Sequence, residues 1–240
     1  MEPVPTRLRL LEAAAQVFLA QGFAATSMDQ VRQAAGVSNG SLYHHYPTKS
    51  ALADALYAHT LRGFHAAMFA AIGPRTSAHN GVKGLIRAYV QWVVDHPGPA
   101  RLLHELRRGG ALSEGGEWAG ASAEGFAVLK QWVATRVQAG EMRDLPFGLW
   151  MALVLSPAMT LTRQWVTQAE PAVPAKVRAA LEHAAWMAVA AAGPKSKAGA
   201  KTSAATYQNG ASPDTRSSGK AFFRPPAVSS APPWSRPSSE

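Results

Sequence analysis

The chain has 240 residues, which is long enough for one or two domains with a substantial hydrophobic core. It contains no cysteine, so disulfides and thiolate metal sites are excluded, and this composition is compatible with a reducing cytoplasm. The net charge is +9, yet the segment from Gly193 onward holds seven Lys and Arg against two acids. The charge excess alone therefore does not identify a partner.

Before residue 193 the apolar side chains recur at helical spacing, and no stretch shows the strict alternation of a β-strand. This pattern predicts an all-α protein. The longest apolar stretch, Leu145–Leu161, is interrupted by Pro146 and Pro157, which argues against a transmembrane helix. The chain begins with an amphipathic segment and not a uniformly apolar one, so we expect no secretory signal and a soluble, cytoplasmic protein.

Glycines and prolines divide the chain into nine expected helices. The first runs from about Thr6 to Gln21 and ends at Gly22. Two short helices follow within residues 27–46, and a longer helix from Lys49 to about Ile72 stops at Gly73-Pro74. Beyond it, the expected helices cover residues 82–95, 99–108, 121–139, 147–167 and 174–192, with a glycine-rich break at 109–120.

The segment Ser27–Tyr46 has the features of two short helices joined by a sharp turn. Ser27 and Gln30 have the spacing of a reciprocal capping box. Gly36 stands where the first helix must turn, a position that suits the left-handed backbone of glycine. Ser38 can cap the second helix, whose first turn holds only small polar residues. This is a helix-turn-helix pattern, and so slim a helix start fits the major groove of DNA.

Around this motif the sequence resembles the DNA-binding domain of the TetR family of bacterial transcriptional regulators. The resemblance rests on Gly22–Met28, Ala34–Ser38, Gly40–Tyr46 and Lys49. It implies a three-helix DNA-binding head, a helical-bundle body that binds an effector and dimerises, and a pseudo-palindromic operator in double-stranded DNA as partner. The expected domains are the head at residues 4–64, with its helix-turn-helix at 27–46, and the body at 65–193.

The second helix of the motif has one side for the core and one for the groove, because Leu42 and Tyr46 are spaced four residues apart. The resemblance implies that Thr26, Ser27 and Lys49 position DNA phosphates, at helix starts whose backbone N–H groups also attract anions. The alternative is a helical hairpin with no role in nucleic-acid binding. The candidate DNA-binding residues are Thr26, Ser27, Ser38, Asn39, Gly40, Ser41, Tyr43, His44 and Lys49.

The body is rich in aromatic residues and methionines, which either fill a core or line a ligand pocket. The resemblance implies an effector pocket, and bulky apolar residues with a few polar ones suit such a site. Core packing is the competing interpretation for each candidate. The candidate pocket residues are Met68, Trp92, Phe126 and Trp150.

No pattern in the chain indicates metal binding or catalysis. His44 and His45 are adjacent on one expected helix and point about 100° apart, and the other histidines lie on separate elements. There is no nucleophile–base arrangement and no phosphate-binding loop that follows a strand. We therefore expect no enzyme, no metal and no cofactor, and only a small-molecule effector of unspecified identity.

The last two expected helices carry stripes of small and apolar residues that permit close approach of another helix. In a monomer such stripes bury against the body. We expect them to pair two chains, because one short recognition helix needs a twofold partner on DNA. The stripes are Leu149, Ala152, Leu153, Ser156, Met159 and Thr160 on one helix, and Val177, Ala180, Leu181, Ala184, Ala185 and Ala188 on the other.

Residues 194–240 are dominated by Ser, Pro, Gly, Ala and Lys and show no apolar periodicity. Such a segment cannot bury enough surface to offset the entropy of ordering, so we expect it to be disordered. Its basic charge either adds non-specific affinity for DNA through counterion release or has no function.

The sequence thus predicts a homodimeric DNA-binding transcriptional regulator, and more narrowly a repressor that a small-molecule effector releases. Two alternatives remain open. One is an activator, or a regulator with a protein signal, on the same fold. The other is a helical interaction module that does not bind DNA.

Overall fold

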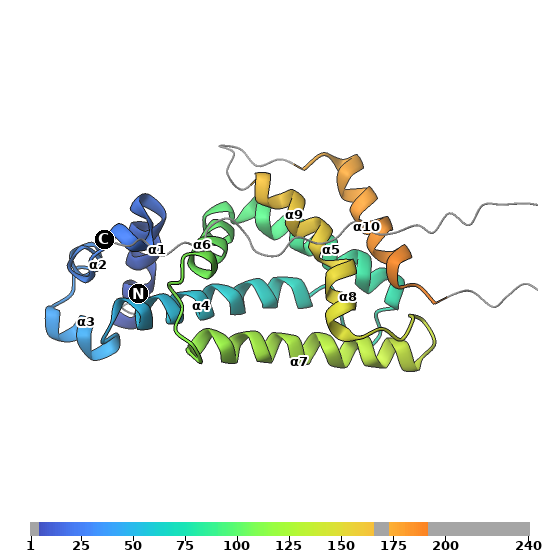
Figure 1. The fold of residues 1–240 in the computed structure, drawn as a ribbon, viewed down its shortest axis with the longest axis horizontal. Coiled ribbons are helices and arrows are strands. Elements are labelled where there is room, and N and C mark those ends of the chain that lie inside the picture. Colours follow the sequence, from blue (N-terminus) through green and yellow to red (C-terminus); the bar gives the residue numbers. More distant parts are fainter. Residues whose placement is uncertain (1–4, 166–172, 192–240) are drawn as a thin grey trace, which may run out of the picture. The chain divides into compact units, whose positions relative to one another are not determined.

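The computed structural model describes residues 5–165 and 173–191, and this part of the chain forms ten α-helices and no strand. The expectation of an all-α fold is confirmed for these residues. The head consists of α1 (Thr6–Ala25), α2 (Met28–Ala35) and α3 (Asn39–His45), coloured in shades of blue (Figure 1). Gly22 interrupts α1 with a φ of 82°, at the position where the sequence places the end of that helix.

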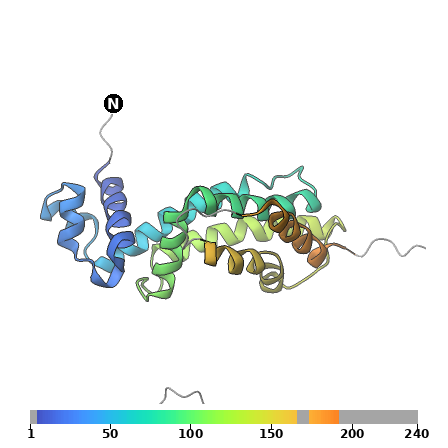
Figure 2. The same ribbon diagram turned by 90° about the horizontal axis from the view of Figure 1, so that it is seen from above.

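Seven further helices follow the head. α4 (Lys49–Phe69) starts against the head and runs along α7 (Glu117–Gln138), and both views show these two helices side by side (Figures 1 and 2). α10 (Ala175–Val189) packs on α5, and the 2.6 Å ion pair of Arg87 with the buried carboxylate of Glu182 joins them. The remaining elements are α5 (Ala78–Asp95), α6 (Pro97–Arg108), α8 (Phe147–Val154) and α9 (Ser156–Trp165).

Several helix boundaries differ from the sequence-based expectation, among them the start of α5, which is Ala78 and not residue 82. The single helix expected over residues 147–167 is two helices, because the chain breaks at Leu155 and restarts at Ser156. Pro157 lacks a backbone N–H and is tolerated in a first helical turn but not in a helix interior, which explains the break. The glycine-rich break expected at 109–120 is shorter, since α7 already begins at Glu117.

The buried residues form two hydrophobic clusters, and these do not divide at the expected boundary between residues 64 and 65. The first cluster joins the head to the N-terminal half of α4 and also takes Leu102 and Leu106 from α6. The second fills the space between α5, α7, α8 and α10. Phe64 packs against both clusters, and α4 runs through the boundary without a break. The division at 64/65 therefore remains a proposal.

None of the helices in residues 5–165 and 173–191 has the length and apolarity needed to cross a membrane. The basic segment 194–240, for which disorder is expected, lies outside the described residues.

Candidate functional site

The helix-turn-helix is fixed by the caps that its sequence predicts. The Ser27 side chain accepts from the Gln30 backbone N–H, and the Gln30 side chain accepts from the Ser27 N–H at 2.7 Å, which confirms the capping box. Gly36 has a φ of 61° at the turn. The guanidinium of Arg9 donates to the carbonyl oxygens of Ala35 and Gly36, at 2.6 and 3.1 Å. Arg9 therefore holds the turn onto α1, a role that no local motif indicates.

The recognition helix α3 separates into a buried side and an exposed side, as expected. Leu42 is fully buried and Tyr46 is 4% exposed, whereas Tyr43 is 50% exposed. The Ser38 side chain caps the helix by accepting from the Ser41 N–H at 3.2 Å. Three more candidates are exposed, namely Asn39, Gly40 and His44, and Ser41 is partly buried. These residues form one continuous polar surface that a DNA groove can receive.

Two of the candidate phosphate contacts have their polar atoms engaged inside the head. Thr26 is 3% exposed, and its hydroxyl donates to the Gly22 carbonyl at 2.8 Å. The Lys49 ammonium donates to three carbonyl oxygens, those of Phe23 and Thr26 at 2.8 Å and of Ala24 at 3.2 Å. It also lies over the Phe23 ring, 4.5 Å from the centroid. Lys49 thus ties the start of α4 to the end of α1.

We expect Lys49→Met to destabilise the head rather than to remove a phosphate contact. The variant keeps the aliphatic stem over Phe23 but leaves three carbonyls without their charged donor, which costs about 1–3 kcal/mol. Thermal unfolding should show a lower Tm, while the slope of log affinity for DNA against log salt should not change. A slope smaller by about one unit with an unchanged Tm would instead establish the phosphate role.

Tyr43→Ala should weaken operator binding without affecting folding. The ring is half exposed, so the free energy of unfolding should change by less than about 0.5 kcal/mol. Loss of a contact to a base edge typically costs about 1–3 kcal/mol of binding. Fluorescence anisotropy with labelled operator measures this loss, and His45→Ala, an exposed neighbour outside the candidate set, is the matched control. Equal losses in the two variants would contradict a specific role for Tyr43.

The body contains a cavity of about 760 Å³, within the range of about 300–1,000 Å³ that is common for small-molecule sites. Three of the four candidates line it, namely Met68, Trp92 and Phe126. Trp150 does not. Its side chain is fully buried in the second cluster, where the ring is parallel to Phe147 with centroids 6.3 Å apart. The structure corrects the expectation for Trp150, which is a core residue.

One long stripe of α4 forms a wall of the cavity, and sequence reasoning recognised only part of it. Successive turns of the helix supply Tyr57, Leu61, Phe64, His65 and Met68. The imidazole of His65 packs against Gly125 of α7, where any side chain would collide with the ring. Burial lowers the pKa of His65, so the ring is neutral near pH 7. The spacing of these five residues along one helix face was a signal that could have located the wall.

A polar pair from α5 and α9 also lines the cavity. The Tyr89 hydroxyl lies 2.8 Å from Thr162 Oγ1, and Thr162 itself donates to the Ala158 carbonyl at 2.9 Å. Tyr89 is therefore the donor of the pair. Its burial raises the pKa of the phenol. The donor hydrogens of both hydroxyls are thus engaged, so other groups of the lining must supply the charge and the hydrogen-bond donors for a ligand.

Comparison with known proteins connects this geometry to one family. Residues 10–56 match the family model for bacterial regulatory proteins of the tetR family. The chain is 42% identical over 55 residues to the HTH-type transcriptional regulator UidR of Escherichia coli (strain K12), a match over 23% of this chain and 28% of UidR. It is 41% identical over 58 residues to the HTH-type transcriptional repressor KstR2 of Rhodococcus jostii (strain RHA1), over 24% of this chain and 26% of KstR2.

These sequence matches thus span only about a quarter of the length of the curated relatives. The likeness in fold extends further. The solved structure of a TetR family transcription regulator from Marinobacter aquaeolei VT8 aligns with a TM-score of 0.66 at 21% identity, over 78% of this chain and 96% of that one. The head thus matches the tetR family of bacterial regulatory proteins, and the helical fold behind it is similar to that of a solved TetR family regulator.

Proposed function

We propose that the protein is a sequence-specific DNA-binding transcriptional regulator of the cytoplasm, acting as a repressor that a small-molecule effector releases. The exposed side of α3 carries this proposal, because it presents Tyr43 and small polar residues on a helix whose start is capped and whose other side is fixed in the core. The relatives with a similar head include transcriptional repressors.

The cavity is connected to the head by two elements that both contribute to its wall. α4 lines the cavity with its middle section and holds the end of α1 through Lys49 at its first residue. Arg101 of α6 also lines the cavity, and its guanidinium donates to the Leu19 carbonyl of α1 at 3.0 Å. A ligand that shifts α4 or α6 would therefore move the head. Coupling between two sites of this kind typically amounts to about 1–3 kcal/mol.

Pairing of two chains through α8, α9 and α10 is supported by the apolar side chains that these helices expose. Among the described residues, Leu149, Leu153, Met159 and Met187 are 47%, 37%, 50% and 58% exposed. A patch of this kind on a soluble chain favours a protein interface. Ala180 and Ala184 of the expected second stripe are exposed as well.

Two other members of the expected second stripe are not available to a partner. Leu181 is 8% exposed and Ala185 is 3% exposed, and both pack in the second cluster of their own protomer. The interface that we propose therefore uses the outer side of α10 together with α8 and α9.

Selection from a random pool of double-stranded DNA tests the proposed function. The full chain should enrich a pseudo-palindrome whose half-sites are about 34–36 Å apart, since two recognition helices related by a twofold axis enter successive major grooves. A mobility-shift titration then measures affinity for the enriched sequence. If no sequence is enriched at low salt, the helical interaction module becomes the better interpretation.

A further inference from the structure

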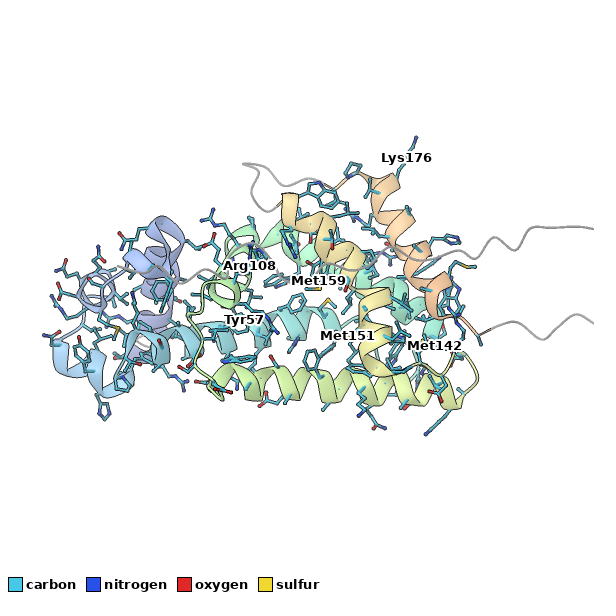
Figure 3. All side chains as sticks on the ribbon, in the orientation of Figure 1. Tyr57, Arg108, Met142, Met151, Met159 and Lys176 are labelled. Carbon is cyan, nitrogen blue, oxygen red and sulfur yellow. The ribbon has the colours of Figure 1, made fainter. Side chains whose placement is uncertain are left out.

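The charged residues in the lining of the cavity are mostly positive. Four arginines contribute to its lining, Arg101, Arg107 and Arg108 from α6 and Arg163 from α9, whereas Glu105 is the one acidic residue in the lining of this described region. Tyr57 and Arg108 lie at one end of the labelled side chains and Met151 lies toward the other (Figure 3). The four arginines of the lining thus come from α6 and α9.

The charge of these arginines affects His104, which also lines the cavity. Burial lowers the pKa of His104, and the neighbouring charges of Arg163 and Arg108 lower it further, against the opposing effect of Glu105. The two guanidinium groups thus disfavour protonation of the imidazole. A positive potential beside these arginines favours an anion and disfavours a cation.

One hydrogen-bond donor of Arg101 lacks an acceptor among residues 5–165 and 173–191. Its Nε is buried and has no hydrogen-bond partner within the described part of the chain, and the Glu105 carboxylate lies 3.5 Å away without forming a hydrogen bond to it. A buried donor that lacks an acceptor is costly. Glu105 is already the ion-pair partner of Arg101, and an anionic oxygen beside Nε would supply the missing acceptor.

Most of the remaining lining is apolar. Phe64, Met68, Phe126, Leu129 and Met151 come from α4, α7 and α8 and provide no charged group. Phe126 is 47% exposed, which is unusual for an aromatic ring that faces the inside of a helical body. Contact with an apolar ligand would remove such surface from water.

We propose that the cavity binds an amphipathic anion, whose apolar body contacts the aromatic and methionine side and whose carboxylate or phosphate headgroup pairs with the arginines of α6 and α9. This inference rests on the proposed function, because it names the class of the effector that the regulator senses. Guanidinium groups bind both headgroups through paired N–H donors, so the cavity recognises the acidic group and the apolar length together.

Isothermal titration calorimetry with the full-length protein tests this proposal with four ten-carbon probes. Decanoate and decyl phosphate carry the acidic headgroups, whereas 1-decanol is neutral and decylamine is cationic. We expect at least one acidic probe to bind about tenfold or more tightly than decanol, and decylamine to bind most weakly. The two acidic probes distinguish a carboxylate ligand from a phosphate ligand.

The double variant Arg108→Gln/Arg163→Gln should reduce the affinity for the acidic probe about tenfold or more and leave decanol binding unchanged. Lys130→Gln, which removes a positive charge from an exposed position on α7, is the matched control and should have no effect. Equal binding of decanoate, decyl phosphate and decanol, or binding of neither acid, would overturn the proposal.

The mobility-shift titration without any ligand keeps the two proposals apart. If the protein binds its selected DNA but neither acid, the ligand class is wrong and the DNA-binding function stands. If an acid binds through the arginines and no DNA sequence is bound, the cavity assignment stands and the regulatory function fails.

Discussion

Leu153→Asp should yield a folded protomer that no longer pairs and has lost operator binding. Leu153 is 37% exposed on α8, beside the exposed residues Leu149 and Met159 of the proposed interface. A carboxylate there would be buried in an apolar contact without a partner, which is costly, whereas in the isolated protomer it stays in water. A single head contacts only one half-site, so operator affinity should fall by about 100-fold or more. Light scattering coupled to size-exclusion chromatography measures the mass, and anisotropy measures the affinity.

The control for this variant is Val128→Asp on α7, where an apolar side chain is 50% exposed outside the proposed interface. It should remain dimeric and bind the operator normally. Leu181→Asp is a poor test, because Leu181 packs inside its own protomer and a charge there would unfold the chain. A wild-type protein that is monomeric at micromolar concentration, or a dimeric Leu153→Asp variant, would contradict the proposed interface.

The features of the head that the sequence predicted correctly depend on short-range chemistry. The capping box of Ser27 and Gln30 and the left-handed Gly36 involve residues within a few positions of one another. Such pairings are encoded locally, and a reader of the sequence can recognise them. The inward positions of Leu42 and Tyr46 follow equally from the helical period.

The roles that sequence reasoning missed depend on residues distant in the chain. Lys49 meets carbonyls at positions 23–26, and Arg9 meets those of Ala35 and Gly36, more than twenty residues away in each case. A basic residue at a helix start has the same sequence pattern whether it binds phosphate or ties two helices together. Only the arrangement of α1 against α4 shows that the Lys49 ammonium is already occupied.

Within the single helix α8, the sequence likewise does not show which residues line the cavity. Trp150 and Met151 are adjacent on α8, and their side chains point about 100° apart. Met151 lines the cavity and Trp150 fills the core behind it. Both faces of α8 are apolar, so periodicity does not distinguish the ligand side from the core side. The break at Leu155 adds to the difficulty, because it ends one helix and starts another just after these residues.

The reassignment of Trp150 from the pocket to the core predicts a large loss of stability in Trp150→Ala. Its indole is fully buried in the cluster that joins α5, α7, α8 and α10, so truncation leaves a large void. Such substitutions cost about 3–5 kcal/mol, a large part of the stability of a typical domain. Urea unfolding of wild type and variant measures the difference, at one fixed protein concentration because a dimer's stability depends on it.

Two further variants test whether the loss of stability comes from the buried ring of Trp150. Trp150→Phe should cost much less than Trp150→Ala, since the ring volume is largely kept and the indole N–H has no hydrogen-bond partner among the described residues. Phe126→Ala removes a ring that is 47% exposed in the cavity, so it should change the free energy of unfolding by less than about 1 kcal/mol. If Trp150→Ala were as stable as Phe126→Ala, then Trp150 would face an open space, and the original assignment of this residue to the ligand pocket would be restored.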